Sequence, residues 1–218
     1  MGNGDIFQIV GFFIAFLLAL CFHEFAHGWV AKKLGDNTAE TMGRLSLNPF
    51  VHADMVGTFI LPLASLFTGA LLFGWAKPVP VNPRNLRDAK NGMFLVALAG
   101  PASNMLLALL CMVALGAVAA TAGTYSSASA QFLVRFIQIN VVLAVFNMIP
   151  IHPLDGGKVI GRFLPINFDR FMEENQMIFM MILLFLFLGG AGQAILGPPV
   201  AYLTNFFIKG ALVLAQVF

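Results

Sequence analysis

The segment from His23 to His27, HEFAH, carries the clearest chemistry in the sequence. Residues four apart share one face of a helix, so both imidazoles can bind the same metal ion. Glu24 stands beside them and can take a proton from water that the metal activates. The 218 residues include only four histidines, and a chance match to this spacing is roughly a one-in-a-thousand event. The pattern indicates a hydrolytic metal site.

The rest of this site must come from elsewhere in the chain. A hydrolytic zinc ion takes three protein ligands and keeps a fourth position for water, and the HEFAH helix supplies two of them. Asp155 is the preferred third ligand, because prolines stop a helix just before it and Gly156 and Gly157 permit tight turns after it. His152 is the rival third ligand. An N-cap role for Asp155 is the purely structural alternative.

These ionisable residues are embedded in a very apolar chain. Hydrophobic residues make up 59% of it and charged residues 10%, whereas a soluble domain is roughly 45–50% apolar and about 25% charged. This composition excludes a conventional water-soluble enzyme and a disordered chain. The net charge of only +2, without a basic block, argues against nucleic-acid binding. An ionisable group deep in a bilayer costs on the order of a few kcal/mol, so a Glu flanked by two His there indicates a function.

The apolar runs predict an all-α polytopic membrane protein. Each span needs about 20 apolar residues, and the runs predict about five to six transmembrane helices. The runs are 6–34, 55–76, 92–123, 130–149, 176–190 and 193–218. We expect one integral-membrane domain over residues 1–218, with its core motifs within 21–162 and C-terminal helices in 171–218.

The basic residues predict the orientation of these helices. Ten of the twelve fall in three segments, 32–44, 77–90 and 158–170, and Lys and Arg mark the cytoplasmic side. For all three segments to lie there, the run Met55–Ala76 must enter the membrane and return as a re-entrant hairpin, with turns at Pro62, Gly69 and Gly74. A plain span that violates the charge rule is the alternative. We expect the protein in the cell membrane, with its active site toward the cytoplasm.

Three further features have both a structural and a functional interpretation. Gly43 to Leu47 alternates like a strand and predicts a short membrane-associated β segment, to which an unwound substrate could pair. His52 and Asp54 follow it, and packing of a surface turn is preferred there over a gate or proton path. Gly100 and Asn104 lie on the third apolar run, where small residues allow close helix packing. That interpretation is preferred over a role for Asn104 near the metal.

The motifs as a set resemble the site-2 protease family of intramembrane zinc metalloproteases. HEFAH in an apolar helix, followed by NxxPxxPLDGG at Asn147–Gly157, carries the resemblance. The stretches Ser46–Thr58, Phe73–Pro83 and Ala99–Asn104 resemble the short prokaryotic branch, which has no PDZ domain. Two positions depart from the usual pattern: His152 stands where proline or another apolar residue is common, and Met55 stands where proline is common.

The resemblance implies a set of roles for individual residues. His23, His27 and Asp155 would bind one zinc ion, and Glu24 would be the catalytic base. Asn147 would hold the substrate or an intermediate. The implied activity is that of a zinc endopeptidase that hydrolyses a peptide bond in or near the transmembrane segment of a membrane protein, in regulated intramembrane proteolysis. Its partners would be that substrate and the lipid bilayer, with no nucleic acid, and the oligomeric state is open.

Two functions from other classes compete with this one. Intramembrane His, Glu and Asp also build the pathways of metal-ion and proton transporters. A transporter is expected to place polar residues through the depth of the bilayer, whereas the outer halves of these runs are nearly bare of them. A non-catalytic membrane adaptor of the same fold is the other alternative, and the intact Glu24 argues against it.

Overall fold

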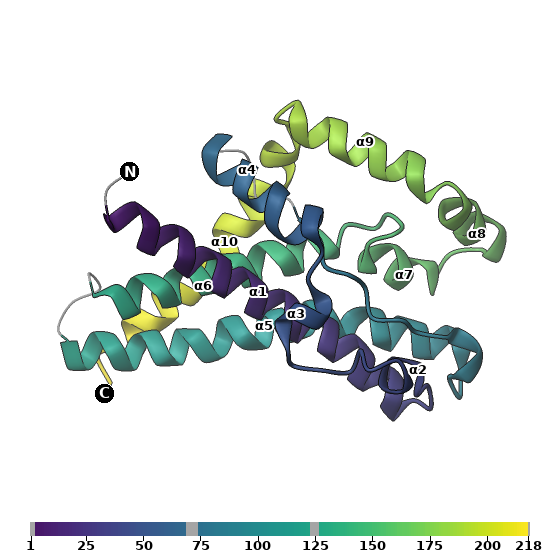
Figure 1. Cartoon of the computed structure of the whole chain (residues 1–218), viewed down its shortest axis with the longest axis horizontal. Coiled ribbons are helices and arrows are strands. Elements are labelled where there is room, and N and C mark those ends of the chain that lie inside the picture. The colour runs from purple at the N-terminus through teal and green to yellow at the C-terminus, as the bar shows by residue number, and fades with distance from the viewer. Residues whose placement is uncertain (1–2, 69–73, 123–126, 218) are drawn as a thin grey trace.

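A computed structural model describes residues 3–68, 74–122 and 127–217 of the chain. Every regular element in these residues is helical, which confirms the predicted all-α class but not the predicted β segment (Figure 1). In chain order the elements are α1 (Asn3–Lys33), α2 (Thr38–Thr41), α3 (Pro49–His52), the π-helix η1 (Met55–Ile60), α4 (Leu61–Thr68), the 3-10 helix η2 (Pro83–Asn85), α5 (Ala89–Ala122), α6 (Ala128–Asn147), α7 (Asp155–Gly161), α8 (Ile166–Glu174), α9 (Gln176–Leu188) and α10 (Ala191–Leu214).

Among the described residues, three helices are long and apolar enough to cross a membrane. They are Ile9–Lys33 in α1, Ala89–Thr121 in α5, and α6. The pair α9 and α10, bent by 83° at the break between them, makes up to a fourth. The described residues therefore do not support the prediction of about five to six spans. Helix α9 has only 13 residues, or about 20 Å at 1.5 Å per residue, which is too short for a bilayer core of about 30 Å.

Hydrogen bonds join the two ends of the run Met55–Ala76. The N–H of Trp75 donates to the carbonyl oxygen of Gly57 at 3.0 Å, and the hydroxyl of Thr58 donates to the carbonyl oxygen of Trp75 at 2.9 Å. The two ends of the segment thus lie together. Pro62 lies in the first turn of α4. The predicted turn at Gly69 falls outside the described residues.

The predicted β segment at Gly43–Leu47 is wrong, because the structure has no strand in the residues that it describes. Gly43 adopts a left-handed conformation with φ of +65°, which ends the preceding turn. The N–H groups of Arg44 and Leu45 both point back to the carbonyl oxygen of Ala39, at 2.7 and 3.1 Å. These amides close α2 and are not free to form a ladder with a second strand.

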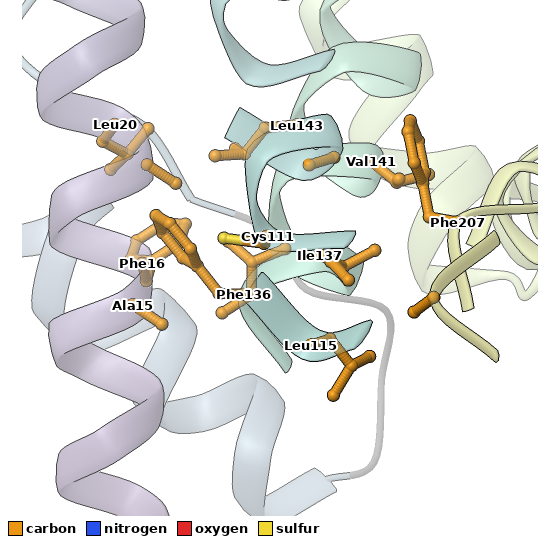
Figure 2. Close-up of a cluster of buried hydrophobic side chains, with 14 of the residues drawn as sticks. Ala15, Phe16, Leu20, Cys111, Leu115, Phe136, Ile137, Val141, Leu143 and Phe207 are labelled. Carbon is orange, nitrogen blue, oxygen red and sulfur yellow. The ribbon is translucent and has the colours of Figure 1, made fainter. Parts of the chain in front are cut away.

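Helices α1, α5, α6 and α10 surround one apolar core. Figure 2 shows Phe16 and Leu20 of α1 facing Cys111 of α5 and Phe136 of α6, with Phe207 of α10 on the other side of α6. Five alanines of this core are fully buried: Ala15, Ala19, Ala108, Ala130 and Ala211. Small residues let the backbones of membrane helices approach closely. This packing holds α1 rigidly against α5 and α6.

The three basic segments of the sequence meet at one end of the helices. The guanidinium of Arg44, in the first segment, donates to the carbonyl oxygen of Lys77, in the second, at 2.9 Å. Nε of Arg162, in the third segment, donates at 2.6 Å to the side-chain oxygen of Asn91, which directly follows the second. The segments that the charge rule assigns to one face are therefore in contact with one another.

Candidate metal centre

The two histidines of α1 face one side of α5. Nδ1 of His27 lies 2.7 Å from the carbonyl oxygen of Val96, and Nδ1 of His23 lies 2.6 Å from Oδ1 of Asn104. Gly100 lies between these two partners, and a Cβ there would overlap Nε2 of both histidines. Val96, Gly100 and Asn104 are spaced four apart and so share one face of the helix. Only glycine at position 100 leaves room for the two rings.

Asp155 reaches the same point from the start of α7. It is the first residue of that helix, and Leu154 occupies the N-cap position, so the N-cap interpretation of Asp155 is wrong. The two following glycines let α7 lie against the preceding loop. A Cβ on Gly156 would overlap the carbonyl oxygen of Met148, and a Cβ on Gly157 would overlap backbone atoms of the same loop. This close approach directs the Asp155 carboxylate toward α1.

The three side chains form a small buried triangle. Oδ2 of Asp155 lies 3.1 Å from Nε2 of His23 and 3.2 Å from Nε2 of His27, and the two Nε2 atoms are 3.0 Å apart. The three residues are only 4–8% exposed. Adjacent ligand atoms around a tetrahedral zinc ion are about 3.3 Å apart, because each lies about 2.0–2.1 Å from the metal. The triangle has the size that a zinc ion requires.

The protons of these groups point away from the centre of the triangle. The carbonyl oxygen of Val96 can only accept, so Nδ1 of His27 carries the proton and Nε2 of the neutral ring presents a lone pair. Oδ2 of Asp155 has no hydrogen-bond donor among the described residues. Converging acceptors of this kind are stabilised by a cation between them, and His₂Asp is a suitable donor set for zinc.

Glu24 lies beside this triangle but is not part of it. Its side chain is 9% exposed, and Oε2 accepts a 2.8 Å hydrogen bond from the backbone N–H of Val79. Val79 is buried, and its side chain lies where a Cβ on Gly28 would be in tight contact. The extended segment around Val79 therefore packs against α1 one turn beyond Glu24 and fixes one of its carboxylate oxygens.

The other predicted site residues form their hydrogen bonds with groups outside the triangle. The amide nitrogen of Asn147 donates to the carbonyl oxygen of Leu143 in its own helix, at 2.9 Å. Nε2 of His152 lies 3.1 Å from Oδ1 of Asp169, so the structure brings Asp155 and not His152 to the two histidines of α1. His52 is buried and its Nε2 lies 2.8 Å from the carbonyl oxygen of Ser46.

The structure adds three residues to the site that sequence reasoning assigned to packing or passed over. Asn104, for which sequence reasoning preferred a packing role, contacts His23 directly. Asn140 of α6 contacts Asn104 in turn, with 2.8 Å between the two amides. Its only signal in the sequence is a polar side chain inside an apolar run. Val79 contributes a backbone N–H, whose only hint is its position between two prolines.

Comparison with known proteins gives a consistent result. The model of Peptidase family M50 matches residues 116–190, a range that contains both Asn147 and Asp155. No solved structure matches the chain significantly.

Three curated relatives illustrate the similarity. "Putative zinc metalloprotease YwhC" of Bacillus subtilis is 37% identical over 191 residues, which are 85% of this chain and 83% of that protein. "Putative zinc metalloprotease Rip2" of Mycolicibacterium smegmatis is 34% identical over 157 residues, 67% of this chain and 56% of the relative. "Putative zinc metalloprotease Rip2" of Mycobacterium tuberculosis is 30% identical over 172 residues, which are 79% of this chain and 64% of that protein. The chain thus spans less than two thirds of the length of either Rip2 protein.

The relationship to the Bacillus protein extends over most of both chains, and the matched family model covers the segment that carries Asp155. Together with the apolar helices, these findings indicate a membrane protein. The chain belongs to peptidase family M50, the site-2 protease family, and is a zinc metalloprotease.

Proposed function

We propose that this zinc metalloprotease hydrolyses a peptide bond in or next to the transmembrane segment of a membrane-protein substrate. The observation that carries the proposal is the position of the acceptor triangle. His23 and His27 belong to a helix long and apolar enough to cross a membrane, and their ring nitrogens meet the carboxylate of Asp155 with almost no exposure to solvent. A hydrolytic centre on such an apolar helix lies where a peptide bond within a lipid-embedded segment can reach it.

Three residues would hold a single zinc ion in this centre: His23, His27 and Asp155. Zinc, when bound, polarises the scissile carbonyl and lowers the pKa of water from about 15.7 to about 7. Glu24 takes the proton from the attacking water and delivers it to the nitrogen of the leaving amine. Because Oε2 of Glu24 accepts from the N–H of Val79, Oε1 is the oxygen that carries this proton.

Asn147 is the proposed donor to the negatively charged oxygen of the tetrahedral intermediate. It is the last residue of α6, directly before the loop that leads to Asp155. Its amide nitrogen is engaged with Leu143 at 2.9 Å. Rotation of this half-buried side chain would free both amide hydrogens for substrate, and a donor aimed at a developing oxyanion stabilises the transition state.

We further propose that the protein lies in the cell membrane with this centre toward the cytoplasm. The mutual contacts of the basic segments support a common side for all three, and an excess of Lys and Arg marks the cytoplasmic face. The hydrogen bonds between the ends of the run Met55–Ala76 support its re-entry from that side. The proposed partners are the bilayer and a membrane protein that another protease has already shortened, as in regulated intramembrane proteolysis.

The test is cleavage of a panel of single-span substrates by the purified protein in liposomes. Glu24→Gln should abolish cleavage and retain zinc, because Gln keeps the shape of Glu but cannot take a proton. Glu40→Gln is the matched control, since Glu40 is exposed and pairs with the exposed Lys32, and it should cleave like wild type. Each substrate is supplied both intact and with its extracytoplasmic part removed. Undiminished cleavage by Glu24→Gln would contradict the proposed mechanism.

A further inference from the structure

We propose that Asn104 and Asn140 are positioning residues that fix the tautomer and the orientation of His23 for metal binding. The inference rests on the proposed function, because it concerns one of the proposed zinc ligands. Neither residue touches the centre of the acceptor triangle. They act through His23, along a chain of hydrogen bonds that links α1, α5 and α6.

The chain of contacts is short and fully buried. Nδ1 of His23 lies 2.6 Å from Oδ1 of Asn104. Nδ2 of Asn104 donates to Oδ1 of Asn140 at 2.8 Å and to the carbonyl oxygen of Ala19 at 3.2 Å. Nδ2 of Asn140 donates to the carbonyl oxygen of Phe136 at 2.8 Å. Both asparagines are 0% exposed, so water does not compete for these groups.

The two ends of the chain determine the direction of every bond in it. A backbone carbonyl can only accept, so the amide nitrogen of Asn104 must face Ala19 and that of Asn140 must face Phe136. The amide oxygen of Asn104 must then face His23. An amide oxygen also only accepts, so the proton of the neutral His23 ring lies on Nδ1. This leaves the lone pair of Nε2 directed at His27 and Asp155.

The cost of this arrangement argues that it serves the metal. Two amides in an apolar helix bundle must find hydrogen-bond partners, because an unpaired buried amide costs about 1–3 kcal/mol on protein scales. Two leucines would fill the same space without that requirement. A metal-bound histidine gains basicity and a fixed orientation when its other ring N–H is held, and loss of such a partner weakens metal affinity about 10–100-fold.

A packing role for Asn104 makes the opposite prediction for two substitutions. Leu fits an apolar environment, whereas a buried Asp does not. A role in packing alone therefore predicts that Asn104→Leu keeps more of the wild-type zinc affinity than Asn104→Asp. Asp, however, still accepts the proton of His23 Nδ1, and Leu cannot. If Asn104 instead acts on the metal through His23, Asn104→Asp keeps more of the wild-type zinc affinity than Asn104→Leu. The two interpretations are separated by the order of the two variants.

The experiment measures the zinc affinity of the full-length protein in detergent, by competition with a chromophoric chelator, and the d–d spectrum after Co²⁺ substitution. We expect Asn104→Leu to bind zinc about 10–100-fold more weakly, and Asn104→Asp to stay within about threefold of wild type. Asn140→Leu should weaken binding less than Asn104→Leu, because Asn104 keeps its bond to Ala19. Ser103→Ala is the matched control, since that hydroxyl donates to the carbonyl oxygen of Gly100 and not to His23 or either asparagine in the described residues, and should match wild type.

The outcomes separate this inference from the proposed function. Wild-type affinity in Asn104→Leu, or equally weak binding by Asn104→Asp and Asn104→Leu, overturns the positioning role and leaves the zinc site intact. A wild-type protein that binds no zinc overturns both. If Asn104→Leu does not fold, the other two asparagine variants decide the matter. Near-wild-type affinity in Asn104→Asp with weaker binding in Asn140→Leu then supports the chain, and any other order overturns it.

Discussion

The backbone N–H of Val79 donates a 2.8 Å hydrogen bond to Oε2 of Glu24, from a segment more than 50 residues further along the chain. Pro78 and Pro80 flank Val79 and have no N–H group. Val79 is therefore the only one of these three residues that can donate from its backbone. The Val79 amide thus holds one oxygen of the proposed base and leaves the other for a proton.

Replacement of Val79 by proline tests this contact. Val79→Pro removes the N–H, and a hydrogen bond to a charged group contributes about 1.5–3 kcal/mol, so we expect kcat for peptide cleavage to fall roughly 10–100-fold. Zinc content should not change, because no hydrogen bond joins Val79 to a proposed ligand in the described part of the chain. Val79→Ala keeps the N–H and loses only side-chain packing, and is the control. Equal losses of kcat in the two variants would assign the effect to packing.

Gly100 provides a test of the room between α1 and α5. A Cβ at this position would overlap Nε2 of His23 and of His27, so Gly100→Ala should lower the zinc content of the purified protein by at least about tenfold. Helix α5 itself should persist, because Ala favours a helix by about 1 kcal/mol over Gly. Gly11→Ala in α1 is the control, since its Cβ would meet only a ring carbon of Phe132 at 3.9 Å. Full zinc occupancy in Gly100→Ala contradicts the geometry of the site.

Asp36 links the end of α1 to the loop that carries η2, and this link should make stability depend on pH. Its carboxylate is fully buried and accepts from Thr38, Asn82 and Asn85. Burial raises the pKa of Asp36, but these hydrogen bonds lower it further, so the net pKa lies below the ordinary value. As pH falls, the unfolded chain therefore binds the proton first, and the stabilisation is lost.

Unfolding of wild type and Asp36→Asn in detergent measures this effect. At pH 7 we expect Asp36→Asn to be less stable by about 1–3 kcal/mol, because donors that faced a carboxylate oxygen are left without an acceptor. The difference should be complete above about pH 5 and should shrink as pH falls below about 4, through the lowered pKa of the folded protein. A difference that stays constant from pH 7 to pH 3 would show that Asp36 does not act through its charge.

Asn147 should affect catalysis without affecting metal binding. If its amide donates to the developing oxyanion, Asn147→Leu lowers kcat about 10²–10³-fold. The zinc content should equal that of wild type, since the side chain hydrogen-bonds to Leu143 and, among the described residues, to none of the proposed ligands. Measurement of cleavage rate and metal content on the same preparation checks both statements. Loss of zinc in this variant would instead indicate that Asn147 holds the Asp155 loop in place.

The sequence predicts the long helices well and the short ones poorly. Helices α1, α5 and α6 each contain one continuous apolar run, and hydropathy detects such runs directly. The run Met55–Ala76 is equally apolar, yet its ends are tied by the hydrogen bond between Trp75 and Gly57. Contacts of this kind join residues distant in sequence and leave no periodic pattern. The β prediction failed for the same reason, since the amides of Arg44 and Leu45 turn back to Ala39.

The residues of the candidate site also form two groups: those that the sequence reveals and those that only the structure reveals. His23, Glu24 and His27 are recognisable because four-residue spacing places the histidines on one helical face. Asp155 stands out as an acid between helix-breaking prolines and glycines. Asn104 and Asn140 act through contacts between separate helices, and Val79 acts through its backbone, which side-chain identity does not reveal. A pattern within one element was visible in the sequence, and a contact between elements required the structure.

The metal content of purified protein tests the central claim most directly. Wild type, Glu24→Gln and Asp155→Ala are prepared in parallel and analysed for zinc by mass spectrometry. The account predicts about one zinc per chain in wild type and in Glu24→Gln, and a loss of most of it in Asp155→Ala, because the third of three protein ligands is gone. Equal zinc in Asp155→Ala and wild type, or no zinc in wild type, would contradict the claim that His23, His27 and Asp155 form the metal site.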